Sequence, residues 1–327
     1  MGKITLERVS NCPSCDSPGS EFWSKAHDRL HRTSDQTFEY RRCLNCHTVF
    51  QALRPVQSEI WRCYPSDYGP HSKRGAHATW SHMPRVIDRI LSRLADTVVG
   101  GPAFRAKLAE AERLLSQAGT MLDFGCGAGK YLDRARKLGC VSIGMDFSPQ
   151  AIEQVRSRGH TALAVDDASW STISAESIGF VRMNHVVEHL YDPRTILAKL
   201  HAVMKSDAVL HISTPNPDGY SATKYRDAWF GLDCPRHIAL LPPQCLENIL
   251  RKIGFDRIEI IPDPHPKDLV RSWAYRRMDR GVMKASQDVT SLVSDGVLNL
   301  YFGSRMARAF AQGHSLDRYH LIARKRA

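Results

Sequence analysis

The sequence predicts an α/β protein built on a mainly parallel β-sheet with helices on both faces, plus a small metal-binding module. Two observations lead to this fold class. Short apolar runs alternate with amphipathic stretches through residues 116–262, which is the pattern of repeated β-α-β units. Two C-x-x-C pairs precede that region, within residues 1–55, and such pairs are typical of a metal site.

The expected strands are short apolar runs bounded by polar or turn-forming residues. Six of them lie at 120–123, 141–145, 162–165, 180–183, 209–213 and 257–261, and a seventh lies at 319–323. Tyr131, Ala135 and Leu138 share one helical face between the first two runs. Ile196, Leu200 and Met204 share a helical face in a later segment.

The 327 residues suggest one mid-sized domain with a smaller companion. We divide the chain into a zinc-ribbon-like module (1–55), a linker and helical cap (56–115), a core (116–262), and a helical insertion with the final strand (263–327). The linker begins rich in proline and tyrosine at 64–70. Two apolar helical faces follow it, made by Val86, Ile87, Ile90, Leu91 and Leu94 and by Leu108, Ala111 and Leu115.

Composition indicates a globular protein, with 43% hydrophobic and 24% charged residues. We find no apolar run long enough to cross a bilayer and no secretion signal at the N-terminus, so we expect a cytoplasmic protein. The nine cysteines are an odd number, and without export a disulfide framework is not expected.

The formal net charge of +11 suits a polyanion such as RNA, or an acidic small molecule such as a sugar nucleotide. Because lysine and arginine are dispersed, a generally basic and well-solvated surface explains the charge equally well.

A glycine-rich turn follows the first core strand. Asp123 opens a run in which Gly125, Gly127 and Gly129 alternate with other residues. Alternating glycines allow a tight turn and a close approach of the backbone to a ligand. Asp146 ends the second strand, where a carboxylate can accept both hydroxyls of a ribose.

The spacing of this turn favours S-adenosylmethionine (SAM) over a dinucleotide. A dinucleotide fingerprint places its third glycine one residue later, and that position is Lys130 here. A carboxylate at Asp123 would also sit badly beside a pyrophosphate, whereas it suits the sulfonium and amine of SAM. A purely structural turn is the remaining alternative.

The run 121–129 resembles motif I of class I SAM-dependent methyltransferases, and 144–149 resembles their acidic second-strand motif. Segments 185–193 and 211–216 resemble the regions after strands four and five. Segment 229–237, followed by Gly254 and Phe255, is similar to bacterial methyltransferases of sugar and surface-polysaccharide pathways, which often begin with two C-x-x-C knuckles.

The resemblance implies a Rossmann-like seven-stranded sheet of order 3-2-1-4-5-7-6. Gly179 departs from the family, which commonly has an acid at the start of strand four. The cofactor residues that the resemblance implies are Asp123, Gly125, Cys126, Gly127, Gly129, Asp146, Phe147, Asp166 and Asn184.

The two cysteine pairs predict one structural Zn²⁺ held by Cys12, Cys15, Cys43 and Cys46. The 27 residues between the pairs exceed the usual ribbon spacing, and a β-rich excursion would absorb them. Surface thiols that bind no metal are one alternative. A metal site in which His47 or Cys63 replaces one of the four cysteines is another.

Segment 185–189 matches the H-x-x-E-H pattern of inverted zincins. A peptidase would need both histidines on one helix, whereas a strand precedes this segment. Because histidine has the pKa of a general base, we name His185 and His237 as candidate catalytic residues. Arg236 is either an anion ligand or a surface residue.

We therefore predict an enzyme that transfers a methyl group from SAM to a small acceptor, of the sugar or sugar-nucleotide type. An RNA methyltransferase that uses its zinc ribbon for recognition, and a non-catalytic scaffold, are the alternatives. Methylation of O, N or C stays open, as does a homodimer formed through the helical insertion.

Overall fold

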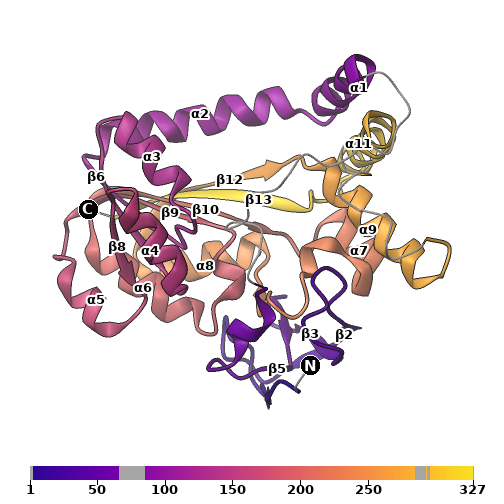
Figure 1. Cartoon of the computed structure of the whole chain (residues 1–327), viewed down its shortest axis with the longest axis horizontal. Coiled ribbons are helices and arrows are strands. Elements are labelled where there is room, and N and C mark those ends of the chain that lie inside the picture. The colour runs from indigo at the N-terminus through magenta and orange to yellow at the C-terminus, as the bar shows by residue number, and fades with distance from the viewer. Residues whose placement is uncertain (1–2, 66–84, 284–291, 293–294, 327) are drawn as a thin grey trace.

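A computed structural model describes residues 3–65, 85–283, 292 and 295–326. Its centre is a seven-stranded sheet of order β12-β13-β10-β9-β6-β7-β8 (Figure 1). The strands are β6 (Thr120–Phe124), β7 (Val141–Asp146), β8 (Thr161–Ala164), β9 (Ile178–Asn184), β10 (Met204–Pro215), β12 (Phe255–Asp263) and β13 (Arg318–Lys325). Only β13 runs antiparallel to its neighbours, β10 and β12. This is the order 3-2-1-4-5-7-6, so the predicted fold class is confirmed.

Successive residues of the central strands pack on opposite faces of the sheet, as the two-residue period of a strand requires. Met121 and Phe180 pack with Leu115 of α2 (Gly101–Gln117), which crosses the upper face in Figure 1. Leu122 and Val181 belong to a second cluster with residues of α6 (Pro193–Val203) and α8 (Pro243–Ile253). Between strands lie α3 (Lys130–Lys137), α4 (Pro149–Ser157) and α5 (Asp167–Thr172).

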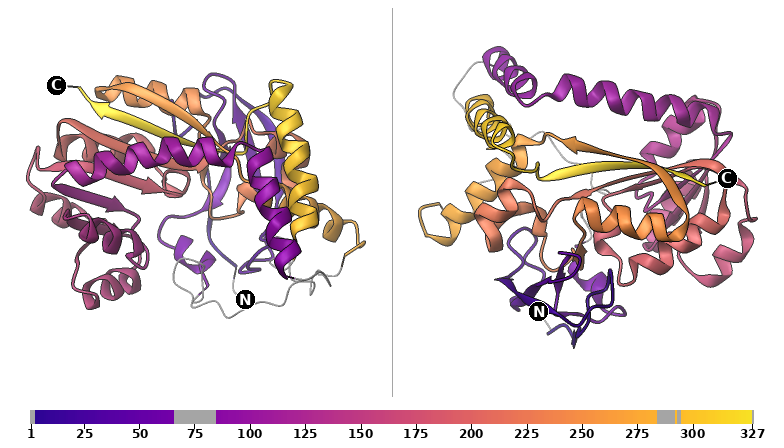
Figure 2. Two further views of the ribbon diagram at one scale, coloured as in Figure 1. Left: turned by 90° about the horizontal axis from the view of Figure 1, so that it is seen from above. Right: turned by 180° about the vertical axis from the view of Figure 1, so that it is seen from behind.

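The insertion between β12 and β13 contains α9 (Pro266–Asp279) and α11 (Gly296–Ala311). Both views of Figure 2 show α1 (Arg85–Val98) lying alongside α11. The helix predicted around Val86 to Leu94 therefore exists, but its apolar face is not buried by the described residues: Val86, Ile87, Ile90 and Leu94 are exposed. Most of the proline- and tyrosine-rich linker, from 66 to 84, lies outside the described residues.

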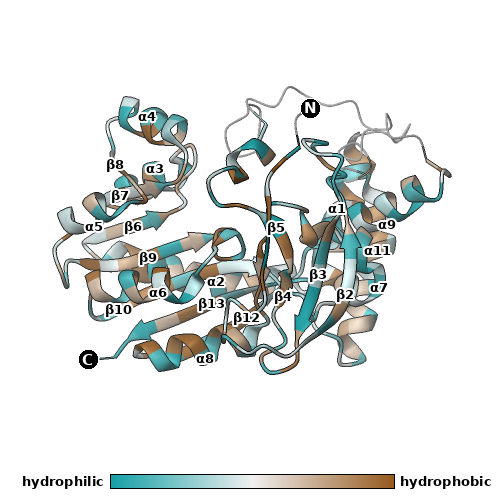
Figure 3. Ribbon diagram, turned by 90° about the horizontal axis from the view of Figure 1, so that it is seen from below, coloured by the Kyte–Doolittle hydropathy of each residue, from teal (hydrophilic) through white to brown (hydrophobic). Residues whose placement is uncertain are grey.

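The N-terminal module is joined to the core by β-sheet hydrogen bonding. Its strands are β1 (Leu6–Arg8), β2 (Ser20–Ala26), β3 (Phe38–Cys43), β4 (Val49–Gln51) and β5 (Leu53–Pro55). The β2-β3 hairpin is the β-rich excursion expected between the cysteine pairs, and much of it is hydrophilic (Figure 3). The four-stranded sheet has the order β11-β4-β3-β2, and β11 (Ala239–Leu240) comes from the segment that follows His237.

Close backbone packing explains why residue 179 is a glycine. A Cβ at this position would lie 2.2 Å from the carbonyl oxygen of Ala118, so a side chain cannot fit at the start of β9. The acid that is common in the family is therefore excluded by a close backbone approach. Among the described residues, no helix is both long and apolar enough to cross a membrane.

Candidate active site

The glycine-rich turn between β6 and α3 has an unusual backbone. Gly125, Gly127 and Gly129 all have positive φ, at 78°, 50° and 72°, a conformation that side chains with a Cβ rarely adopt. A Cβ on Gly125 would lie 2.3 Å from a methyl carbon of Val186, and one on Gly129 would lie 2.9 Å from a methyl carbon of Val155. The sequence therefore forms a tight cradle whose backbone a ligand can approach closely.

Asp146 is fixed beside this cradle by backbone donors. Its Oδ2 accepts a hydrogen bond from the Gly127 amide at 2.8 Å, and its Oδ1 accepts one from the Ser148 amide at 2.9 Å. Each carboxylate oxygen can accept a further bond. The carboxylate is thus oriented at the end of β7, where it can receive a diol such as that of ribose.

Asp123 has one oxygen without a partner. Its side chain is buried, Oδ1 accepts from Arg182 Nη1 at 3.0 Å, and Oδ2 has no hydrogen-bond partner. Burial raises the pKa of Asp123, and the positive charge of Arg182 opposes that rise. A buried unsatisfied acceptor costs about 1–3 kcal/mol. A ligand that brings a donor or a positive charge to the cradle would remove that cost.

The other predicted cofactor residues contribute in different ways. The thiol of Cys126 packs into an apolar cluster with Leu132 and Ile152, and its backbone N–H donates to the Met145 carbonyl at 3.1 Å. Phe147 is 53% exposed just after β7. Asp166 caps α5 by accepting from the Ser169 amide at 2.7 Å. These side chains and Asn184 follow the carboxyl ends of adjacent parallel strands, the edge where open α/β sheets bind ligands.

His185 and a buried glutamate form a pair at the same edge of the sheet. His185 has a φ of 55° directly after β9, and its Nδ1 lies 3.2 Å from Glu188 Oε1. Its Nε2 lies 3.3 Å from Arg318 Nη1. Since a guanidinium can only donate, Nε2 accepts and Nδ1 carries the proton. Arg318 is held in turn by Asp268.

Glu188 organises this part of the site from η2 (Val187–His189). It is fully buried, and its Oε2 accepts from Thr214 Oγ1 at 2.9 Å. Burial raises the pKa of Glu188, but the His185 hydrogen bond and the nearby histidines outweigh it and lower the pKa to about 2. Because His185 precedes η2 with a left-handed backbone, the two histidines of the H-x-x-E-H pattern do not share a helix.

His237 faces the same glutamate from another segment. Its Nδ1 donates to the Gly231 carbonyl at 2.7 Å, and its Nε2 lies 3.9 Å from both Glu188 Oε1 and Asp233 Oδ2. Burial, together with the charge of His189, lowers the pKa of His237 to about 4. The structure thus brings both predicted catalytic histidines to one buried carboxylate.

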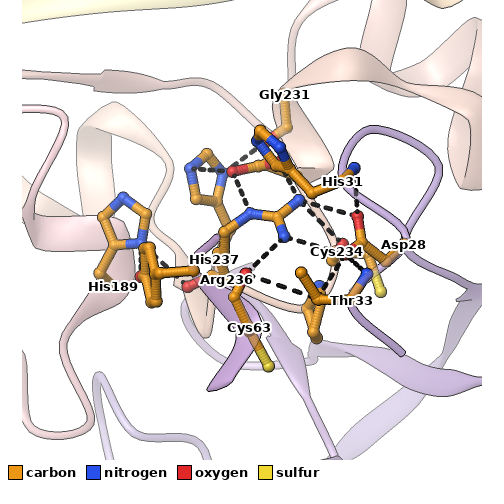
Figure 4. Close-up of polar contacts among 12 residues, drawn as sticks. Asp28, His31, Thr33, Cys63, His189, Gly231, Cys234, Arg236 and His237 are labelled. Carbon is orange, nitrogen blue, oxygen red and sulfur yellow. Dashed lines mark hydrogen bonds and ion pairs between the residues drawn. The ribbon is translucent and has the colours of Figure 1, made fainter. Parts of the chain in front are cut away.

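Arg236 is not a surface residue, which corrects one interpretation made from the sequence; it binds carboxylates, as the other interpretation expected, but these belong to the protein's own aspartates. It is fully buried, and its guanidinium bonds Asp28 at 3.0 and 3.1 Å and Asp233 at 2.7 and 3.0 Å (Figure 4). Its Nη1 also donates to the Cys63 carbonyl at 3.0 Å. Asp28 belongs to the N-terminal module, so this arginine ties the module to the His237 segment.

Further contacts hold the same segment against the module. Gln51 Nε2 donates to the carbonyls of Pro235 at 2.7 Å and His237 at 2.9 Å. The Tyr191 hydroxyl donates to the Pro55 carbonyl at 2.7 Å. Together with the β4–β11 pairing, these contacts make the module one wall of the candidate active site.

The four predicted metal-ligating cysteines converge in the module, as expected. All four sulfurs lie within 4.8 Å of one another, with Cys12 and Cys46 at 3.5 Å and Cys15 and Cys43 at 3.6 Å. The corresponding edge in a Zn²⁺–thiolate tetrahedron is about 3.8 Å, so the group fits a zinc ion. His47 and Cys63 lie outside this cluster.

Sequence reasoning missed several side chains that shape the site. Asp28 fixes Arg236, while Asp268 and Arg318 support His185. Arg318 and His185 are 133 residues apart in the chain. No local spacing could reveal that contact, because it depends on how β13 returns to the sheet.

Comparisons with known proteins agree with this geometry. The family model described as a methyltransferase domain matches residues 79–260, which is more than half of the chain. The chain therefore belongs to the methyltransferase domain family.

Individual relatives are distant. The ubiquinone biosynthesis O-methyltransferase of Cereibacter sphaeroides is 26% identical over 150 residues, covering 42% of this chain and 61% of that protein. The chain thus spans about three fifths of the length of such relatives. The ribosomal protein L11 methyltransferase of Dechloromonas aromatica is 41% identical over 73 residues, or 21% of this chain and 25% of that one. A SAM-dependent methyltransferase structure from Archaeoglobus fulgidus aligns with a TM-score of 0.47 and 21% identity, covering 67% and 92%.

Proposed function

We propose that this protein transfers a methyl group from SAM to a small acceptor of the sugar or sugar-nucleotide type. One observation carries the proposal: the glycine cradle, which follows Asp123 and its unpartnered Oδ2, and the His185–Glu188 pair come directly after β6 and β9, two parallel neighbours of the sheet. The first feature suits a cationic nucleoside ligand and the second suits removal of a proton. Membership of the methyltransferase domain family supports both.

In this proposal the backbone of Gly125 to Gly129 approaches the cofactor, and Asp146 accepts its ribose hydroxyls. Asp123 Oδ2 faces its cationic end, and Phe147, Asp166 and Asn184 line the remaining edge. SAM supplies an electrophilic methyl group when bound, so the protein has only to position an acceptor and remove its proton.

His185 is our candidate general base. Glu188 accepts from Nδ1 and so fixes the tautomer whose Nε2 can take a proton, which is the role of the carboxylate in a serine protease triad. Arg318 holds that Nε2 in the described structure. An acceptor hydroxyl inserted between the two side chains would hydrogen-bond to the imidazole instead.

We further propose that Cys12, Cys15, Cys43 and Cys46 hold one structural Zn²⁺. The thiol separations support a tetrahedral site with no open position. The proposed ion stabilises the N-terminal module, in which Gln51 and β4 pack against the His237 segment.

A sugar-type acceptor is supported by the resemblance of segment 229–237. The +11 charge is weaker evidence for RNA, because lysine and arginine are dispersed along the chain and do not form one long basic block. The relatives named ubiquinone biosynthesis O-methyltransferases make a hydroxyl oxygen the acceptor atom to compare.

The test is transfer of labelled methyl from SAM to a panel of nucleotide sugars, phenolic acids and total RNA. We expect incorporation into a nucleotide sugar, and a His185→Gln variant with kcat about 10²- to 10⁴-fold lower but unchanged SAM affinity. His314→Gln, at an exposed histidine, is the control and should keep full activity. Labelling of RNA alone would overturn the acceptor class, and an active His185→Gln variant would remove the proposed base.

A further inference from the structure

Glu188, which pairs with His185, also lies close to two further histidines. Glu188 and His189 come from η2 and His237 from the segment before β11, and one ligand atom of each lies within 4.8 Å of the others. Glu188 and His237 are buried, while His189 is partly exposed. The cluster is therefore enclosed on two sides and reachable on the third.

Both imidazoles are already oriented in the way that metal-ligating histidines are. His189 Nδ1 donates to the carbonyl of Arg236 at 2.9 Å, and His237 Nδ1 donates to the carbonyl of Gly231 at 2.7 Å (Figure 4). A carbonyl only accepts, so a neutral His237 carries its proton on Nδ1 and keeps a lone pair on Nε2. His189 Nδ1 also lies 3.0 Å from the Tyr64 hydroxyl, which accepts when Nδ1 carries the proton for the Arg236 carbonyl. Such backbone acceptors fix the tautomer and orientation of histidine ligands.

The atoms around His237 Nε2 are electron-pair donors. Glu188 Oε1 and Asp233 Oδ2 both lie 3.9 Å away, which is too far for a hydrogen bond. Glu188 Oε1 also accepts from His185 Nδ1, and Asp233 Oδ2 accepts from Arg236 Nε. A cation at this position would be attracted by both carboxylates. Ligand atoms around a tetrahedral zinc with bonds of 2.0–2.2 Å are about 3.3–3.6 Å apart, so the separation between His237 and Glu188 would shorten by a few tenths of an ångström. The three ligand atoms lie within 4.8 Å of one another, so His189 would also move closer to the other two on binding the ion.

We propose that Glu188, His189 and His237 bind a divalent first-row transition metal, with the carboxylate of Asp233 beside them as a fourth side chain. Two imidazoles and a carboxylate suit Zn²⁺, Fe²⁺ or Mn²⁺ and leave coordination positions open. This site is separate from the four-cysteine cluster. Its use rests on the proposed function: the metal would bind the acceptor oxygen and lower its pKa beside His185.

Co²⁺ is the probe, added to the 327-residue chain after its four cysteines have been loaded with Zn²⁺. We expect one equivalent to bind with visible d–d bands of nitrogen and oxygen ligands and without a thiolate-to-cobalt charge-transfer band. His237→Gln and Glu188→Gln should each weaken this binding at least about tenfold. His320→Gln is the matched control, because this buried histidine on β13 pairs with His211 instead.

Circular dichroism and SAM affinity are measured on every variant, so a folding defect is recognised; the milder His189→Gln, at a partly exposed position, replaces any variant that does not fold. Absence of Co²⁺ binding at millimolar concentration in wild type, or binding that survives both substitutions, would overturn the metal site. These readouts need no acceptor, so a failed methyl-transfer assay with intact Co²⁺ binding would count against the proposed function alone.

Discussion

Replacing Arg236 with methionine is expected to lower the free energy of unfolding by about 3–5 kcal/mol, as expected for breaking a buried ion pair from one side. The guanidinium is enclosed between Asp28 and Asp233, and the Asp28 side chain is itself fully buried. Without the arginine, both carboxylates lack their counter-charge. Urea denaturation of wild type and variant measures the difference.

A second substitution, Asp28→Asn, should change the free energy of unfolding in opposite directions in the wild-type and Arg236→Met backgrounds. In the wild-type background Asp28→Asn should destabilise the protein, because it removes a partner of Arg236. In the Arg236→Met background the same change should recover part of the loss, because it removes an unpaired buried charge. Arg113→Met, at an exposed arginine, should change stability by no more than about 0.5 kcal/mol. A destabilising Asp28→Asn in both backgrounds would contradict the ion-pair account.

Loss of the proposed zinc is expected to abolish methyl transfer while leaving SAM binding within a few-fold of wild type. Cys43→Ser removes one of four ligands, and metal coordination supplies on the order of 10 kcal/mol to comparable small modules. The metal would then no longer stabilise the sheet in which β4 pairs with β11, and Gln51 would no longer donate a hydrogen bond to the carbonyl of His237. The glycine cradle and Asp146 lie on other elements and keep their contacts.

The comparison is made by measuring zinc content, SAM affinity and turnover on one preparation. Cys140→Ser serves as the matched control, since this buried thiol donates to the Leu115 carbonyl outside the metal cluster. A serine hydroxyl can make the same bond, so zinc and turnover should be retained. Full turnover by a zinc-free Cys43→Ser variant would show that the module does not support the active site.

The fold and the cradle were predictable because their signals are local. Apolar runs such as 180–183 mark strands directly, and positive φ at Gly125 is what a glycine between β6 and α3 leads one to expect. The four cysteines were predictable for the same reason, since each pair forms a single turn that presents two thiols.

The acceptor side of the site was not predictable, since it depends on contacts between distant segments. Arg236 stands in a polar tripeptide that resembles a surface loop, yet it meets Asp28 across 208 residues. Likewise, the apolar face of α1 indicated burial that the described residues do not provide. The residues of a segment predict whether it forms a helix or a strand. The tertiary contacts of its side chains depend on how whole helices and strands pack together.

Calorimetric titration of SAM into wild type, Asp146→Ala and Asp167→Ala tests the central claim most directly. Asp146 accepts a hydrogen bond from the Gly127 amide and lines the cradle. The control residue Asp167, at the start of α5, has a side chain that is 92% exposed and pairs with Lys199. We expect saturable binding of one SAM per chain to wild type and Asp167→Ala, and its loss in Asp146→Ala. A folded wild-type protein that binds no SAM, or an Asp146→Ala variant that binds it equally well, would contradict the account.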